Sequence, residues 1–240
     1  MIFGLDDLAR NPAAFLLVFL LRIVAVLIAL TLHELCHGLV ATRLGDPTPI
    51  RQGRLTLNPI SHLDPAGTIL LLFAGFGWAK PIQVNPMYFS GNRIQKMALV
   101  GAAGPTSNFV QAFIFALPFM AGLLSPNSNV LRPLASLPVS SLTSPMELLT
   151  AILTLLVIIN VSIGLFNLIP VPPLDGARIL PAFLPRSAAA SFYRFEPWGV
   201  GILLVFFMVD AFFLRGAITS RLLGPPVFYI AGFLLTFHFF

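Results

Sequence analysis

Long apolar runs alternate with short polar segments along most of the chain. A helix that crosses a bilayer needs about 20 apolar residues, and five runs approach or exceed that length. They cover residues 13–42, 97–122, 147–169, 198–214 and 225–240. The pattern therefore predicts an all-α transmembrane fold, a polytopic helix bundle with about five or six membrane segments.

The stretch between the first two runs has a different pattern. Turn signals such as Gly-Asp-Pro at 45–47 divide it, and the short pieces 53–57 and 82–84 are typical of strands. Residues 67–79 are apolar but short and rich in glycine, which indicates a re-entrant or interfacial segment. We expect a small membrane-associated, β-rich insertion over residues 44–96. A Ser-, Pro- and Asn-rich loop is expected over 123–146.

Composition also indicates an integral membrane protein. The chain is 57% hydrophobic and 10% charged, whereas a soluble domain carries about a quarter charged residues. The net charge of +5 comes mostly from residues between the apolar runs, without the basic cluster and aromatic platform of a nucleic-acid site. The single cysteine excludes an internal disulfide. With no internal repeat, we expect one domain over residues 1–240.

The basic residues predict an orientation. Six lie in 43–96 and three in 178–197, but only one lies in 123–146. The positive-inside rule places the first two segments in the cytoplasm and the N-terminus outside, although Arg215 and Arg221 argue weakly against this. The acidic start lacks the basic region of a cleaved signal peptide, so we expect it to be retained.

A metal-binding pattern lies near the end of the first apolar run. In His33-Glu34-Leu35-Cys36-His37 the two histidines are four residues apart, so on a helix they share one face. Two imidazoles so placed can bind Zn²⁺, with Glu34 free as the general base. The alternative is two ordinary surface histidines, but ionisable side chains in a membrane helix are costly and usually functional. Residue 13 is about 30 Å of helix from His33, which places the motif toward the cytoplasmic side.

A catalytic zinc site needs a third protein ligand, and Asp175 is the best candidate. It follows three closely spaced prolines at the end of the third apolar run, where the helix cannot continue. Irregular backbone at membrane depth is tolerated where it is buried in protein or lines a wet cavity. The alternative is a loop that ends the helix and carries a solvated aspartate.

Three separated motifs resemble the site-2 proteases, a family of intramembrane zinc metalloproteases. They are the H-E-x-x-H of 33–37, the G-P-x-x-N of 104–108 and the N-x-x-P-x-x-P-L-D-G of 167–176. The segments 53–59 and 77–81 also resemble the short prokaryotic branch. The chain has no room for the PDZ-like or nucleotide-sensing domains that other members carry.

The resemblance implies a catalytic three-helix core over about 13–176, with accessory helices over about 198–240. One catalytic Zn²⁺ would be bound by His33, His37 and Asp175, and Glu34 would activate water. Asn108 and Asn167 would hold the substrate backbone or the oxyanion, or else satisfy buried backbone groups.

The implied activity is hydrolysis of peptide bonds within or near transmembrane segments, in regulated intramembrane proteolysis. Implied partners are the lipid bilayer and a transmembrane substrate, such as a membrane-tethered regulator or a remnant signal peptide. One rival is a metalloprotease of the prenyl-protein processing type, whose third ligand is a downstream glutamate; Glu147 and Glu196 lack the matching motif. A zinc-binding transporter or inactive scaffold is the non-enzyme rival.

Four further residues carry smaller expectations. Cys36 is expected to be a packing residue, and His62 to make a structural or regulatory hydrogen bond. Arg22 and Asp210 lie at similar depths in antiparallel helices, so we expect them to form an ion pair.

Overall fold

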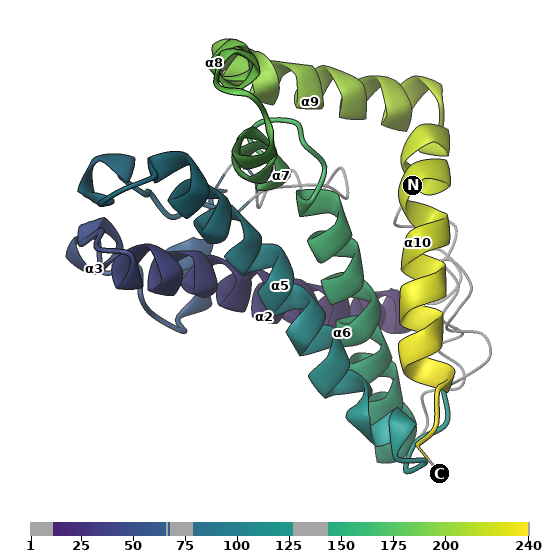
Figure 1. Ribbon diagram of the computed structural model, residues 1–240. Helices are drawn as coiled ribbons and strands as arrows, with labels where there is room; N and C mark the ends of the chain where they lie inside the picture. The colour runs from purple at the N-terminus through teal and green to yellow at the C-terminus, as the bar shows by residue number, and fades with distance from the viewer. Residues whose placement is uncertain (1–11, 66, 68–78, 127–143, 240) are drawn as a thin grey trace.

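The computed structural model describes residues 12–65, 67, 79–126 and 144–239, and this part of the chain is helical, without a named strand. Figure 1 shows α2 (Pro12–Arg43) crossing the pair formed by α5 (Arg93–Met120) and α6 (Pro145–Asn167). Beside that pair stands α10 (Ala217–Thr236). The predicted helical fold is therefore confirmed.

Within the described residues, four stretches are long and apolar enough to cross a membrane: Leu16–Arg43, Pro145–Asn167, Arg186–Phe213 and Ala217–Thr236. The five or six segments expected from the sequence are thus not supported. The helix α5 is long enough, but polar residues such as Thr106, Asn108 and Gln111 lower its hydropathy. Asn108 and Gln111 are buried in the bundle, so their polarity serves contacts inside the protein.

The core lies where α6 packs against its neighbours. Ala25 and Ala29 of α2 are fully buried against Leu155 and Ile159 of α6, and the small side chains let the two helices approach closely. A second cluster joins α5, α6 and α10 through Ala112, Ala116, Phe119, Val157, Val161, Ala231 and Leu235. The helix α6 is the most buried of the four candidate spans.

A capping box starts α6. Ser144 accepts a hydrogen bond from the backbone N–H of Glu147, and the Glu147 carboxylate accepts one from the backbone N–H of Ser144. Each side chain thereby satisfies a backbone donor that would otherwise lack a partner. Glu147 thus acts as a cap at the helix start, while Asp175 follows the opposite end of α6.

The predicted β-rich insertion over residues 44–96 is wrong for its described residues. They form α3 (Thr48–Arg51) and the short 3₁₀ turns η1 (Pro59–His62) and η2 (Pro86–Tyr88). Their only pairing is one isolated bridge, between Leu63 and Ala79. Except for Gly67 and Ala79, the expected re-entrant segment lies outside the described residues, as does most of the expected 123–146 loop.

Side chains, instead of a neighbouring strand, take up backbone groups of this insertion. The Arg54 guanidinium donates to the Ser61 carbonyl, and the His62 ring donates to the Thr56 carbonyl over 2.9 Å. The segment 82–84, whose alternating pattern predicts a strand, has no regular secondary structure. The Ile82 amide donates to the Glu34 carboxylate and not to a strand.

The C-terminal third begins with short helices. After α7 (Gly176–Ile179) and η5 (Leu180–Phe183), a helical stretch runs through α8 (Arg186–Phe195), η6 (Glu196–Trp198), α9 (Gly199–Met208) and the π-helix η7 (Val209–Phe213). Figure 1 shows that α9 then turns sharply into α10.

The expected ion pair between Arg22 and Asp210 is not among the ion pairs of the described residues. The Asp210 carboxylate instead accepts hydrogen bonds from the backbone N–H groups of Ile218 and Thr219, at 2.8 and 3.0 Å. Free N–H groups at a helix start attract a carboxylate strongly. Asp210 therefore caps α10, a role that a comparison of helix depths did not reveal.

Candidate metal centre

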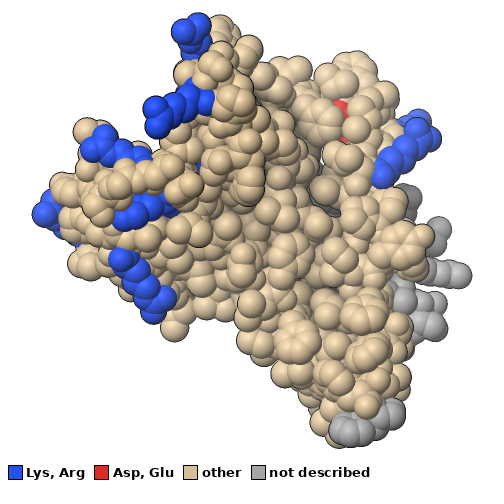
Figure 2. All heavy atoms as spheres, viewed as in Figure 1, with Lys and Arg blue, Asp and Glu red and all other residues tan. Residues whose placement is uncertain are grey.

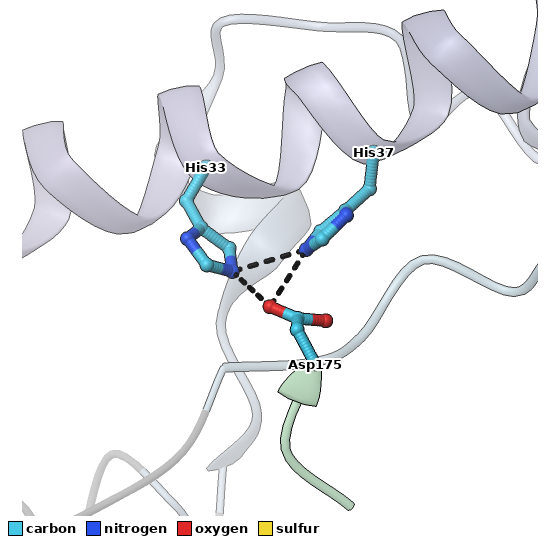
Figure 3. A group of neighbouring side chains, drawn as sticks. All are labelled: His33, His37 and Asp175. Carbon is cyan, nitrogen blue, oxygen red and sulfur yellow. Dashed lines mark hydrogen bonds and ion pairs between the residues drawn. The ribbon is translucent and has the colours of Figure 1, made fainter. Parts of the chain in front are cut away.

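Two elements bring the three expected ligands together (Figure 3). The helix α2 presents His33 and His37 on one face, and the loop between α6 and α7 presents Asp175. The Nε2 atoms of the histidines are 3.1 Å apart, and Asp175 Oδ2 lies 3.0 Å from His33 Nε2 and 3.1 Å from His37 Nε2. All three residues are buried.

The other nitrogen of each ring is already engaged. His33 Nδ1 is 2.6 Å from the Asn108 side-chain oxygen, and His37 Nδ1 is 2.7 Å from the Val100 carbonyl oxygen. Both partners are acceptors, so each Nδ1 donates a proton and each neutral ring keeps a lone pair on Nε2. Sequence reasoning did not identify either partner.

Three acceptor atoms, two Nε2 and one Oδ2, therefore face one another at about 3 Å. Such lone pairs repel unless a cation lies among them. Ligands at 2.0–2.1 Å from a tetrahedral zinc ion are about 3.3 Å apart, which is close to the triangle found here. His33, His37 and Asp175 thus fit Zn²⁺ in donor type, number and spacing.

The helix α5 lines the centre at Gly104. A Cβ atom at this position would lie 2.3 Å from His37 Nε2 and 2.5 Å from His33 Nε2. No side chain fits there, so glycine is what allows α5 to pass so close to the two imidazoles. The motif comparison contained Gly104, but only the structure gives its physical role.

Asp175 is held from both sides. Its Oδ2 faces the histidines, while Oδ1 lies 3.6 Å from an Arg178 guanidinium nitrogen. The positive Arg178 guanidinium favours the ionised carboxylate, which is the form in which an aspartate binds a metal ion.

Close backbone packing fixes the loop that carries Asp175. A Cβ atom on Gly176 would lie 2.3 Å from the Leu168 carbonyl oxygen and 2.5 Å from that of Ile169. The loop thus folds back onto the end of α6. Likewise, Gly199 at the start of α9 packs directly against Pro172.

Glu34 is buried next to the two histidines in sequence, and its Oε2 accepts the 2.9 Å hydrogen bond from Ile82 N–H. Oε1 takes no hydrogen bond from the described residues. The carboxylate is thereby oriented by one oxygen while the other stays available.

The other residues considered for the site are Asn108, Asn167 and Cys36. Asn108 contacts His33, and both of its N–H groups already donate, to the Ala29 carbonyl and the Asn160 side chain. Asn167, at the end of α6, donates one N–H to the Ile163 carbonyl over 3.0 Å. Cys36 is half-buried and does not belong to the candidate metal group.

A model of peptidase family M50 matches residues 21–209. The chain is 40% identical over 188 residues to "Putative zinc metalloprotease YwhC" of Bacillus subtilis, covering 78% of this chain and 79% of that one. It is 26% identical over 204 residues to "Putative zinc metalloprotease Rip2" of Mycolicibacterium smegmatis, covering 84% of this chain and 71% of that one. No solved structure matches the chain.

Proposed function

The chain belongs to peptidase family M50, the site-2 protease family, and from this premise we propose that His33, His37 and Asp175 hold its catalytic zinc ion. The protein is a multi-pass membrane protein and an intramembrane zinc metalloprotease. The observation that carries the proposal is the convergence of the two Nε2 atoms and Asp175 Oδ2, all at about 3 Å.

Zinc bound in such a site supplies Lewis acidity, which lowers the pKa of water and polarises a carbonyl oxygen. The chain contributes Glu34 as the general base. Because Ile82 N–H occupies Oε2, Oε1 is the atom that accepts the proton from the attacking water. Glu34 then gives this proton to the amide nitrogen as the peptide C–N bond breaks.

Of the two amides, Asn167 is the one that keeps a donor for the substrate backbone. One of its N–H groups donates to Ile163, and the amide keeps a second donor for a carbonyl or an oxyanion. Asn108 was expected to share this role, but both of its donors are already used inside the bundle.

The proposed substrates are transmembrane segments of other membrane proteins, among them membrane-tethered regulators and remnant signal peptides. A substrate must unwind locally to expose its peptide bond. Figure 2 shows most of the visible Lys and Arg side chains over α3, the start of α5 and α8, and a smaller group on the other side near the start of α10. The positive-inside rule makes the side with the larger group the cytoplasmic side, and the end of α2 nearer the metal centre lies there.

The function is tested with Glu34→Gln against the wild-type protein, measuring bound zinc and cleavage of a transmembrane reporter in proteoliposomes. We expect zinc to remain bound and cleavage to fall about 10²-fold or more, since the variant loses only the proton acceptor. Glu147→Gln is the matched control, because glutamine also serves in a capping box.

Cleavage by Glu34→Gln at the wild-type rate would contradict the general-base role. Wild-type protein that binds zinc and moves it across the bilayer without cleaving a reporter would instead favour a carrier.

A further inference from the structure

A line of buried amides leads away from the metal centre into the bundle. Asn108 of α5 and Asn160 of α6 are both fully buried, and neighbouring residues such as Val157 and Val161 are apolar. The two helices lie side by side in Figure 1 and share the main core cluster. A polar side chain buried there is costly unless its hydrogen bonds are made.

Backbone carbonyls fix which way each amide points. Asn160 Nδ2 donates to the Leu156 carbonyl over 2.9 Å, so Asn160 Oδ1 is the atom that faces Asn108. Asn108 Nδ2 donates to Asn160 Oδ1 over 2.8 Å and to the Ala29 carbonyl over 3.3 Å. A carbonyl oxygen only accepts, so neither amide can be reversed without leaving two acceptors face to face.

The direction of these hydrogen bonds also fixes the tautomer of His33. With its Nδ2 directed at Ala29 and Asn160, Asn108 presents Oδ1 to His33 Nδ1 at 2.6 Å. His33 must therefore carry its proton on Nδ1, and Nε2 keeps the lone pair that faces the centre. The chain of hydrogen bonds has one direction, from His33 to the Leu156 carbonyl.

We propose that Asn160 is a positioning residue of the metal centre, which acts through Asn108 to fix the tautomer and direction of His33. This inference rests on the proposed function, since it assumes that His33 binds the metal. Asn160 makes its hydrogen bonds to Asn108 and the Leu156 carbonyl, and none to His33, His37 or Asp175. Without it, the Asn108 amide loses one of the two contacts that hold its orientation.

The test is Asn160→Leu, which keeps the side-chain size but removes both hydrogen bonds. We measure zinc affinity by competition with a chelator and the visible spectrum of the Co²⁺-substituted protein. Loss of a partner behind a ligating histidine typically weakens metal binding about 10- to 100-fold. We expect about tenfold weaker zinc binding here, with an altered Co²⁺ spectrum.

Thr154→Val is the matched control. Thr154 is also fully buried on α6, and its hydroxyl donates to the carbonyl four residues earlier, as Asn160 does. It is not part of the hydrogen-bond chain to His33. Equal zinc affinities for Asn160→Leu and Thr154→Val would overturn the proposal.

A double-mutant comparison tests the route. If Asn160 acts through Asn108, then Asn160→Leu should change zinc affinity little in protein that already carries Asn108→Leu. If the effects of the two substitutions on zinc affinity are fully additive, Asn160 only stabilises the packing of α5 against α6, and the proposal is overturned. Should Asn160→Leu not fold, Asn160→Ala is measured in the same way.

The tautomer of His33 can also be measured in the wild-type protein, so this test does not depend on the folding of a variant. Nitrogen-15 NMR of metal-free protein labelled at histidine should find His33 Nδ1 protonated, and an unprotonated Nδ1 would overturn the proposal. These readouts are separate from peptide cleavage. If wild-type protein binds no zinc at His33, the proposed function fails; if it does and Asn160 has no effect, only this inference fails.

Discussion

At the scale of single residues, acceptors behind the imidazoles decide what the histidines can do. A neutral histidine can present either ring nitrogen, and the partner of one nitrogen selects the other. The Val100 carbonyl makes that selection for His37, and the Asn108 side chain makes it for His33. Both Nε2 atoms thus face the same point before any metal arrives.

Gly104 is the residue whose change should damage the centre most directly without touching a ligand. In Gly104→Ala the new methyl group would overlap both Nε2 atoms, so the imidazoles or α5 must move. We expect zinc affinity to fall about tenfold or more, with loss of cleavage. Chelator competition on purified protein measures the affinity.

Gly232→Ala serves as the control for this prediction, because a Cβ at Gly232 of α10 meets nothing within 4 Å. Its zinc affinity should equal that of the wild-type protein. Wild-type zinc affinity in Gly104→Ala would contradict the close approach of α5 to the two imidazoles.

At this scale the sequence predicted that His33, His37 and Asp175 come together, but it did not predict the residues that support them. The spacing of His33 and His37 is a property of one helix, so it can be read from the chain. Val100 and Gly104 reach the centre, and Asn160 reaches Asn108, through packing between helices, which no local sequence pattern reports.

At the scale of elements, the segment after residue 79 has no regular secondary structure, and its backbone amides make hydrogen bonds to other parts of the chain. Lys80 N–H donates to the His62 carbonyl over 2.8 Å, and Asn85 N–H donates to Asp46 Oδ2 over 2.7 Å. Between them, Ile82 N–H holds Glu34. A backbone outside regular secondary structure needs partners for its amides, and here the His62 carbonyl and the Glu34 and Asp46 carboxylates supply them.

The start of α10 offers a test away from the metal centre. Asp210→Ala removes the carboxylate that caps the Ile218 and Thr219 amides, so it should lower the melting temperature of the protein. Asp210→Asn keeps one acceptor oxygen, so its melting temperature should fall less than that of Asp210→Ala. Thermal unfolding in detergent measures both.

Zinc affinity should stay unchanged in the Asp210 variants. Glu196→Ala is the control, since this exposed acid of the same helical stretch accepts no hydrogen bond from the described residues. A melting temperature for Asp210→Ala equal to that of Glu196→Ala would contradict the capping role.

At the scale of the whole molecule, the metal centre joins parts of the chain that are far apart in sequence. His33 and His37 come from α2, Asp175 from the loop after α6, and Gly104 of α5 lies against both imidazoles. A metal bound there therefore stabilises the packing of three helices at once.

Metal removal should consequently destabilise the fold. A ligand present at 100 times its Kd stabilises the folded state by about 2.7 kcal/mol, so a strong chelator should lower the wild-type melting temperature measurably. The Asp175→Asn variant, which lacks one anionic ligand, should respond much less. Equal responses of the two proteins would contradict the three-ligand site.

The sequence by itself determined the membrane class and the main helices, and it predicted the group His33, His37 and Asp175 that could bind a metal ion, because apolar length and i,i+4 spacing are local properties. It suggested strands over 44–96, where alternation predicts an extended backbone but not its partner. Only the tertiary structure decided that the Ile82 amide pairs with Glu34, that Asp210 caps α10, and that α5 brings Asn108 to His33. Those outcomes depend on which surfaces come into contact when the helices pack. Such contacts join residues that are far apart in sequence, so the pattern of any one segment does not reveal them.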